Sequence, residues 1–183
     1  THSDWETDTA VVTGGGSWGN PASNSNTTTD GWNLGQGGTG SGGTGPNGGV
    51  HSDLDGSHDT SGRYMYVEGT GVKDDRVCVV RSPGINYSTS MLSTSNNLDL
   101  KFWLHQYSSN NSGHNLYIYI DDNPTSTESA ATLLHTITDF TEYNSNSAAW
   151  SQKTVSLNSY RAPDKTFYIY FVADGATSFR CDI

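Results

Sequence analysis

One acidic loop carries the side chains best suited to bind a metal ion. Its alternating oxygen donors are Asp53, Asp55, Ser57 and Asp59. A curled loop with this spacing can direct three carboxylates and a hydroxyl toward one hard cation, and Ca²⁺ takes about six to eight oxygen ligands. The loop departs from an EF-hand, because glycine stands at its fourth position instead of its sixth and Tyr64 at its twelfth. The sequence therefore leaves open an irregular structural calcium site and a solvated acidic turn.

The sequence pattern contains no marked catalytic arrangement. The six histidines form no His-Glu-x-x-His or His-x-His pair, and neither cysteine has another cysteine two to four residues away, so we expect no zinc site. Serines are numerous, but no Gly-x-Ser-x-Gly elbow precedes a helix pattern. The acidic residues cluster in loops without the paired carboxylates that a glycosidase needs across a cleft. We therefore expect a protein that is not an enzyme.

The composition favours an all-β fold. Of the 183 residues, 24 are Ser, 22 Thr, 15 Asn and 21 Gly, so good helix formers are scarce. The hydrophobic fraction of 32% is low, which also occurs in disordered chains. However, the aromatic fraction is 11%, and disordered chains are poor in aromatic residues. A single β domain of this length can bury a substantial core.

The charge balance limits the partners. Nine Lys and Arg stand against 19 Asp and Glu, and the net charge is −10. The chain has no basic stripe to neutralise phosphates, so nucleic acid and anionic membrane surfaces are poor partners. Membrane insertion is not expected, because no run of about 18 apolar residues occurs. A protein or a glycan is the expected partner.

The acidic composition, rich in Ser, Thr and Asn, and three glycosylation motifs favour an oxidising, extracellular compartment. The sequons begin at Asn26, Asn86 and Asn110. Cys78 and Cys181 are either two buried thiols or a disulfide. A disulfide between them would close a loop of about 100 residues, for which the chain-entropy model gives roughly 4–5 kcal/mol.

Segments of alternating hydrophobicity recur from residue 63 to the end of the sequence. The expected strands are 63–68, 76–81, 98–106, 115–121, 132–137, 150–157, 167–172 and 179–183. Within the fourth of these, Leu116, Ile118 and Ile120 share one face, and Tyr117 and Tyr119 share the other. Short strands with one apolar and one wet face are typical of an antiparallel sandwich or barrel.

Two segments are expected to lie outside this regular pattern. Residues 1–34 carry scattered apolar anchors and are expected to form an N-terminal arm or the first strands. The glycine-rich stretch 35–49 offers no side chain for a core and predicts a loop. Residues 110–113, Asn-Asn-Ser-Gly, predict a hairpin connection between the strands on either side, because these residues tolerate a positive φ.

The order of several motifs resembles the MAM domain family (meprin, A5 antigen, receptor phosphatase mu) over residues 30–183. The matching segments are Thr44-Gly45-Pro46, His58-Asp59-Thr60, Gly62 to Glu68, Arg76 to Pro83, Leu100 to Tyr107 with Gln106 where the family has Met, Trp150, Val155-x-Leu157-x-x-Tyr160, Phe167 to Val172, Gly175 and Asp182-Ile183.

The resemblance implies a jelly-roll β-sandwich of two antiparallel sheets and an extracellular, non-catalytic module for adhesion, oligomerisation or ligand binding. It also implies a structural cation, with Asp53, Asp55, Asp59 and Asp182 as candidate ligands. The family's Asp-His-Thr reads His58-Asp59-Thr60 in this sequence, so its ligand corresponds to Asp55 or Asp59. Vertebrate members usually carry four cysteines, whereas this chain has two. The family's last strand continues past Asp-Ile, so we expect a missing strand to follow Ile183 or to come from a neighbouring molecule.

The leading hypothesis for function is an adhesion or self-association module. Its expected binding surface is a wet strand face carrying Tyr117, Tyr119, Tyr168 and Tyr170, since aromatic rings stack on sugars or bury at protein interfaces. Ordinary cross-strand tyrosine pairing is the simpler explanation of the same pattern. The alternatives are a subunit of an extracellular glycoprotein fibre and a carbohydrate-binding module of a larger secreted enzyme.

The calcium hypothesis predicts a thermal shift. A ligand that binds only the native state raises the melting temperature, so Ca²⁺ should raise it and a chelator should lower it again. Asp55→Asn should abolish most of the difference, whereas Asp99→Asn in a predicted strand should leave it intact. Identical melting curves with Ca²⁺ and with chelator would eliminate the site.

Overall fold

The described part of the chain is built almost wholly of β-strands. The structure is a computed structural model that describes residues 32–36, 50–51, 58–59, 63–67, 76–86, 97–108, 114–124, 126, 130–138, 150–160, 165–175 and 181–182. All strand pairs among these residues are antiparallel. Antiparallel strands with one buried face account for the alternating hydrophobicity of the sequence.

The largest sheet has five strands. Its order is β10 (Thr132–Ile137), β9 (His114–Asp121), β12 (Thr166–Gly175) and β5 (Arg76–Arg81), and β6 (Ile85–Asn86) also pairs with β12. Strand β12 is the longest described strand and is hydrogen-bonded along both edges. In this register, Tyr170 lies opposite both Tyr119 of β9 and Arg81 of β5.

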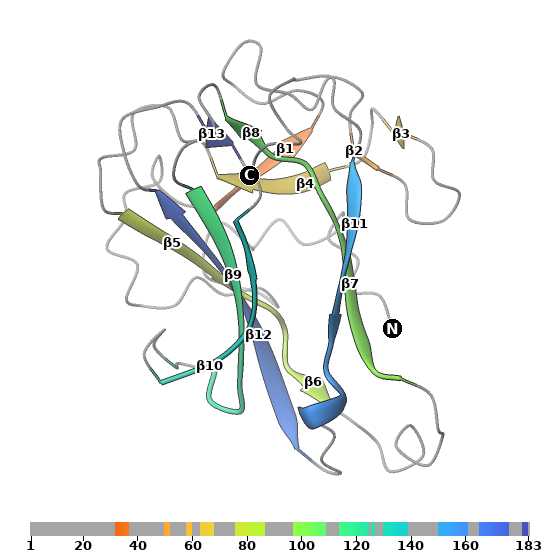
Figure 1. Ribbon diagram of the computed structural model, residues 1–183, viewed down its shortest axis with the longest axis vertical. Coiled ribbons are helices and arrows are strands. Elements are labelled where there is room, and N and C mark those ends of the chain that lie inside the picture. The colour runs from red at the N-terminus through yellow and green to blue at the C-terminus, as the bar shows by residue number, and fades with distance from the viewer. Residues whose placement is uncertain are drawn as a thin grey trace.

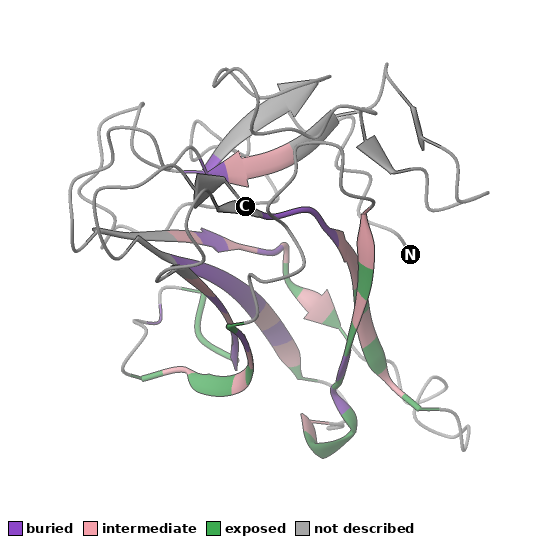
Figure 2. Cartoon of the chain, turned by 45° about the horizontal axis from the view of Figure 1, so that its top comes forward, coloured by how far each residue is buried: buried purple, intermediate pink, exposed green. Residues whose placement is uncertain are grey.

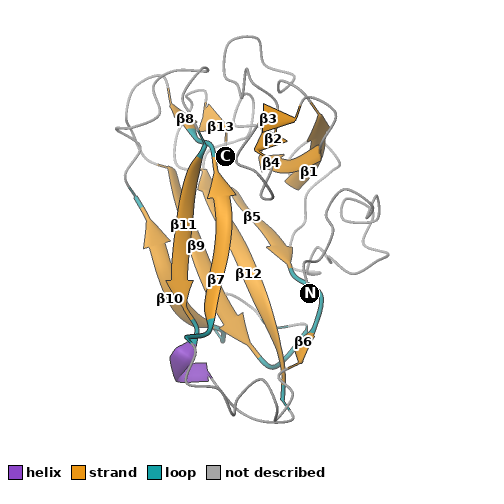
Figure 3. Cartoon of the chain, turned by 90° about the vertical axis from the view of Figure 1, so that its right-hand side faces the viewer, coloured by secondary structure: helices purple, strands orange, loops and turns teal. Residues whose placement is uncertain are grey.

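Other strands form two-stranded pairs. These are β7 (Asp99–Leu104) with β11 (Ser151–Ser156), β1 (Trp32–Gln36) with β4 (Arg63–Val67), and β8 (Tyr107–Ser108) with β13 (Cys181–Asp182). β7 and β11 form a second layer, which stands to the right of the large sheet in Figure 1 and in front of it in Figure 3. The pairs β1–β4 and β8–β13 lie at the upper end of the molecule in both views. A short pair, β2 (Val50–His51) with β3 (His58–Asp59), and a 3₁₀ turn η2 (Asn158–Tyr160) complete the described elements. The predicted class, an all-β jelly-roll sandwich of antiparallel sheets, is confirmed.

The core lies between the two layers. Leu116, Ile118 and Ile120 of β9 are almost fully buried on the inner face, as the sequence pattern predicts. Phe171 of β12 meets Phe102 of β7 edge to face, with ring centroids 5.3 Å apart. Buried positions follow the long strands of the large sheet, whereas β10 at its rim shows exposed positions (Figure 2). The ring contact between β7 and β12 is one of the links that hold the layers together.

The structure corrects two sequence predictions about connections. Gly35 and Gln36, predicted as part of a loop, extend β1 and lie opposite Tyr64 and Arg63 of β4. A glycine pairs in a sheet through its backbone, so the absence of a side chain does not end a strand. The segment 110–113 does not join hairpin partners, because β8 before it pairs with β13, whereas β9 after it pairs with β10 and β12. Turn residues indicate where a chain reverses and leave the pairing partner undefined.

A serine hydroxyl continues the sheet where β5 ends. The N–H of Ser82 donates to the carbonyl of Ile169 at 2.8 Å, and the N–H of Ile169 donates to Ser82 Oγ at 2.9 Å. The next residue, Pro83, has no N–H to contribute to a ladder. A Cβ on Gly84 would lie 2.8 Å from the Thr166 methyl group, so glycine permits the close approach of β12. The Ser82-Pro83-Gly84 segment therefore connects β5 to β6, and both of these strands pair with β12.

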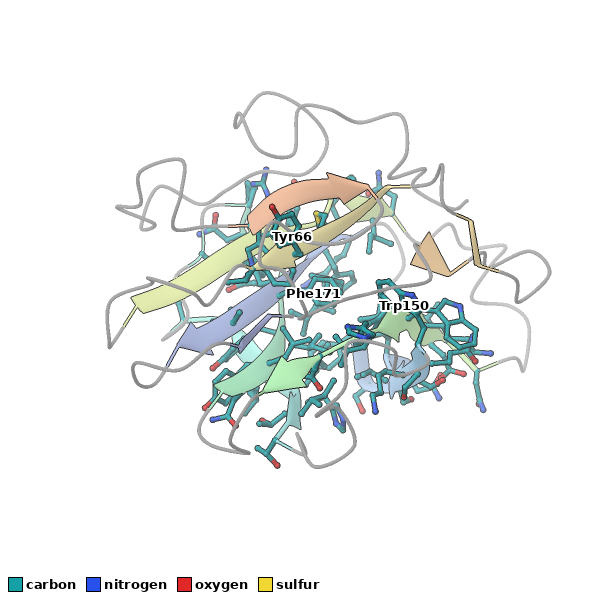
Figure 4. The ribbon with its side chains drawn as sticks, turned by 90° about the horizontal axis from the view of Figure 1, so that it is seen from above. Tyr66, Trp150 and Phe171 are labelled. Carbon is teal, nitrogen blue, oxygen red and sulfur yellow. The ribbon has the colours of Figure 1, made fainter. Side chains whose placement is uncertain are left out.

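A glutamine is buried at the end of β7. The side chain of Gln106 is 0% exposed. Neither of its amide atoms has a hydrogen-bond partner in the part of the chain that the structure describes. Its neighbour His105 is also buried, with its ring centroid 5.7 Å from that of Trp150. Trp150 lies beside the β7–β11 pair, away from the central Phe171 (Figure 4). A buried amide without hydrogen-bond partners, such as that of Gln106, lowers the free energy of unfolding.

Replacing Gln106 with methionine should therefore stabilise the fold. Methionine keeps a similar shape and removes the desolvated amide, so we expect the free energy of unfolding to rise by about 1–3 kcal/mol. Urea unfolding monitored by tryptophan fluorescence measures the change. The control is Gln152→Met at an exposed position of β11, which should shift the stability by less than about 0.5 kcal/mol. A loss of stability in Gln106→Met would contradict the account of this residue.

Candidate functional site

The four tyrosines predicted as a binding surface lie together on the outer face of the five-stranded sheet. Tyr117 and Tyr119 come from β9, and Tyr168 and Tyr170 come from β12. They alternate with the core residues of the same strands and therefore point away from the core. With Val79 and Val172 they form a second apolar cluster, which we call the outer tyrosine face.

The prediction that this face is wet is wrong for two of the four tyrosines. Tyr119 is 8% exposed and Tyr170 only 3%. The connection after β9 turns back toward the sheet, and the hydroxyl of Tyr170 donates a hydrogen bond to the carbonyl of Asn123. The N–H of Ser126 reaches the same hydroxyl at 3.3 Å. The β9–β10 connection therefore covers part of the face that the alternation assigned to solvent.

Asp121 fixes the conformation of this connection. Its Oδ1 accepts a hydrogen bond from the N–H of Asn123 at 3.0 Å, and its Oδ2 accepts one from Ser126 Oγ at 2.5 Å. Partial burial raises the pKa of Asp121, but these hydrogen bonds outweigh it, so the pKa lies below its usual value. The carboxylate thus holds both ends of the turn that covers Tyr170.

Arg81 of β5 holds the same connection from the other flank of β12. Its guanidinium carbon lies 5.1 Å from the ring centroid of Tyr168, in cation–π contact. Its Nη1 donates a hydrogen bond to the carbonyl of Pro124. Burial raises the pKa of Tyr170, and the hydrogen bond from the Ser126 N–H and then the nearby Arg81 charge oppose this effect without cancelling it. One cationic side chain therefore links β5, β12 and the connection.

This geometry does not form a flat aromatic platform for a sugar. Tyr119 and Tyr170 are buried, and a ring face of Tyr168 is taken by Arg81. Tyr117 is half-buried, and its ring is tilted by 46° from that of Tyr119. Its hydroxyl accepts a hydrogen bond from Asn115 Nδ2 at 2.9 Å. The tyrosines stabilise one another and the connection above them, in keeping with cross-strand pairing.

One exposed apolar side chain, that of Leu133, lies at the rim of the outer tyrosine face. Leu133 of β10 pairs with Tyr119 and is 48% exposed. It is the one large hydrophobic side chain among the described residues that is exposed to this degree.

Apart from Asn86, the other predicted site residues fall into two groups. Asn26, Asn110, Asp53 and Asp55 lie outside the described residues. Asp59 pairs with Val50, Asp182 with Tyr107, Cys181 with Ser108 and Cys78 with Ala173 in the backbone register. The side chains of these four residues are not described, so the calcium site and the disulfide remain predictions. Within the described ranges, no cluster of three or more His, Cys, Asp or Glu side chains suits a metal ion.

Asn86 is the sequon asparagine whose side chain the structure describes. It is exposed in β6, and its Oδ1 accepts a hydrogen bond from Thr166 Oγ1. A glycan attaches to Nδ2, so this hydrogen bond leaves the acceptor atom of the modification available. Among the described residues, no helix is long and apolar enough to cross a membrane.

Sequence reasoning missed Arg81, Asp121, Asn123 and Ser126. The residues Asp121-Asp122-Asn123-Pro124 carry a recognisable turn signal. That signal predicts a turn and not the strand against which the turn folds. The role of Arg81 has no signal of its own in the sequence.

Comparison with known proteins supports the fold. No family model matches the chain, and no curated protein sequence matches it. Among solved structures, the chain is similar to the K1 cleaved adhesin domain of Lys-gingipain from Porphyromonas gingivalis, with a TM-score of 0.53 and 20% sequence identity. The match covers 91% of this chain and 85% of the other. The two chains share a β-sandwich fold.

The role of Asp121 predicts an acid-dependent loss of stability. Its pKa is lowered in the folded state, while an unfolded Asp has a pKa of about 3.9. Its contribution is therefore complete above about pH 4 and is lost as the pH falls through the folded-state value. Urea unfolding from about pH 6 to about pH 2 should show a shallower acid loss in Asp121→Asn than in the unmodified chain.

The matched control is Asp99→Asn, which removes the same charge at an exposed position of β7. It should follow the unmodified chain over the whole pH range. Equal acid slopes in all three proteins would show that Asp121 does not fix the connection.

Proposed function

We propose that this chain is an extracellular, non-catalytic adhesion module that binds proteins. The observation that carries the proposal is the outer tyrosine face, which is partly covered by the β9–β10 connection and presents an exposed leucine at its rim. Such a surface lacks the open aromatic platform of a sugar site. Its rim strand β10 contains no Asp, Glu, Lys or Arg and carries the exposed Leu133, so a protein segment is the kind of partner that its edge can accept.

The fold likeness supports the same class of function. The similar solved structure is an adhesin domain, and the likeness extends over most of both chains. At 20% identity it supports the class and not a particular partner. The resemblance to MAM domains points in the same direction, since these modules act in adhesion and oligomerisation. Membership of that family is part of the proposal.

The proposed extracellular location rests on the composition, the three sequons and the exposure of one sequon asparagine. The chain is acidic and rich in Ser, Thr and Asn, and it carries three sequons. Asn86 of one sequon is exposed at a strand position. A disulfide between Cys78 and Cys181 and a structural calcium ion at the acidic loop belong to the same proposal.

The carbohydrate-binding alternative depends on Tyr117. Its half-buried ring is the remaining tyrosine on the face that is neither buried nor stacked on Arg81. The fibre alternative depends on the residues around the last strand and on the arm 1–34, most of which lie outside the described residues.

Adhesion of coated beads distinguishes these functions. Beads carrying the chain should adhere to one another or to surfaces coated with extracellular-matrix proteins, and the chain should pass unretarded through polysaccharide affinity gels. Bare beads and beads carrying an unrelated acidic β-sandwich serve as controls.

Two results would overturn the protein-binding assignment. The first is retention on a polysaccharide gel that is lost in Tyr117→Ala and kept in Gln152→Ala. The second is an absence of bead adhesion on every protein surface and between beads.

A further inference from the structure

The outer tyrosine face binds main-chain groups of the connection between β9 and β10. The hydroxyl of Tyr170 donates a hydrogen bond to the carbonyl of Asn123, and Nη1 of Arg81 donates one to the carbonyl of Pro124. The N–H of Ser126 reaches the Tyr170 hydroxyl at 3.3 Å. Backbone N–H and C=O groups are common to all polypeptides. The side chains of this face therefore make contacts that a segment of another protein can also make.

The connection contributes little apolar surface to this contact. Residues 122–131 read Asp-Asn-Pro-Thr-Ser-Thr-Glu-Ser-Ala-Ala and contain no Val, Leu, Ile, Met or aromatic residue. Among its described residues, Ser126 is buried and Ala131 packs against the tyrosine cluster. The hydrophobic gain in free energy is roughly proportional to the apolar area removed from water. The connection therefore covers the tyrosines without a large hydrophobic gain.

Polar contacts hold the connection in place instead. The carboxylate of Asp121 accepts hydrogen bonds from the N–H of Asn123 and from Ser126 Oγ. Water replaces hydrogen bonds of this kind when a segment lifts, so their net contribution is small. Segments with few buried apolar contacts open at a lower free energy than the whole fold. The sheet beneath keeps its own ladder, in which Tyr170 pairs with Tyr119. The connection can therefore leave the face while the sheet stays folded.

We infer that the outer tyrosine face is a peptide-binding site, which the chain's own β9–β10 connection occupies in this structure. The inference rests on the proposed function and assigns a protein contact to the face itself. Once the connection lifts, the Tyr170 hydroxyl and the Arg81 guanidinium donate to carbonyl groups of a partner segment. The buried rings of Tyr119 and Tyr170 then become part of the contact surface, and Tyr and Arg are enriched among the residues that dominate binding energy.

The chemistry of the face defines the partner as an extended polypeptide segment with apolar side chains. The two donors require main-chain carbonyls, and the cluster of Tyr119, Tyr170 and Val172 requires apolar side chains. A segment that supplies both gains the hydrophobic contact that the connection lacks. The connection is tethered beside the face and has a high effective concentration there. It therefore covers the face until such a partner displaces it.

Asp121→Ala tests whether the connection is a removable cover. The substitution removes both hydrogen bonds of the carboxylate and leaves the donors of the face intact. Tetranitromethane nitrates accessible tyrosines, and mass analysis of peptides measures the rate at each one. Tyr170 should be nitrated about tenfold faster in the variant, because a hydrogen bond to a charged group no longer opposes opening. Tyr117, whose hydroxyl is bonded to Asn115, should react at an unchanged rate.

Adhesion tests whether the uncovered face binds protein. Beads carrying Asp121→Ala should adhere more strongly to surfaces coated with extracellular-matrix proteins than beads carrying the unmodified chain. Asp99→Ala, at an exposed position of β7, should change neither nitration nor adhesion. Adding Arg81→Ala to Asp121→Ala should keep the fast nitration and cancel the gain in adhesion, because the site loses a donor. Circular dichroism establishes that each variant is folded.

Ser126→Ala carries the same test with a smaller perturbation, since it removes one of the two hydrogen bonds to Asp121. It should raise the nitration rate of Tyr170 in the same direction by a smaller factor. An unchanged nitration rate of Tyr170 in both single variants would overturn the inference. Fast nitration without a gain in adhesion would also overturn it, and adhesion equal to that of the unmodified chain would leave the proposed function standing. An absence of adhesion in every protein removes the proposed function itself.

Discussion

The structure depends on strand β12, which is hydrogen-bonded along both edges. β9 lies on one side, and β5 and then β6 lie on the other. Its inward residues supply much of the core, and its outward residues supply half of the tyrosines on the opposite face. Because adjacent residues of one strand point to opposite faces, the backbone register that positions Phe171 in the core also positions Tyr170 against Tyr119 and Arg81. The core and the outer tyrosine face are thus set by the same ladder.

The outer face shows how a loop changes the meaning of an alternating pattern. Polar and aromatic residues in alternation predict one dry and one wet side. Here the connection that follows β9 returns to the sheet, where Tyr170, Arg81 and Asp121 hold it by hydrogen bonds. A tyrosine suits this position, because its ring packs on the sheet and its hydroxyl binds the backbone above it. Exposed apolar surface is then left at the rim, on Leu133.

Much of the fold could be predicted from the sequence. The strands assigned as β5, β9, β10 and β11 agree with the predicted segments to within about a residue at each end, and the inward residues of β9 are those expected. Period-two patterns report local conformation reliably because side-chain direction follows the backbone. The pairing across 110–113 was predicted wrongly, and the strand through Gly35 was missed, because pairing partners are distant in sequence.

The sequence by itself determined the strand-forming segments, the faces that enter the core, and the acidic, sequon-bearing character of the surface. Only the tertiary structure decided that Tyr119 and Tyr170 are buried, that Arg81 stacks on Tyr168, and that β10 stands at a rim. The physical reason is that alternation is a property of one strand. Burial of its outward face depends on a loop, and edge position depends on strand order, and both arise from contacts between segments far apart in the chain.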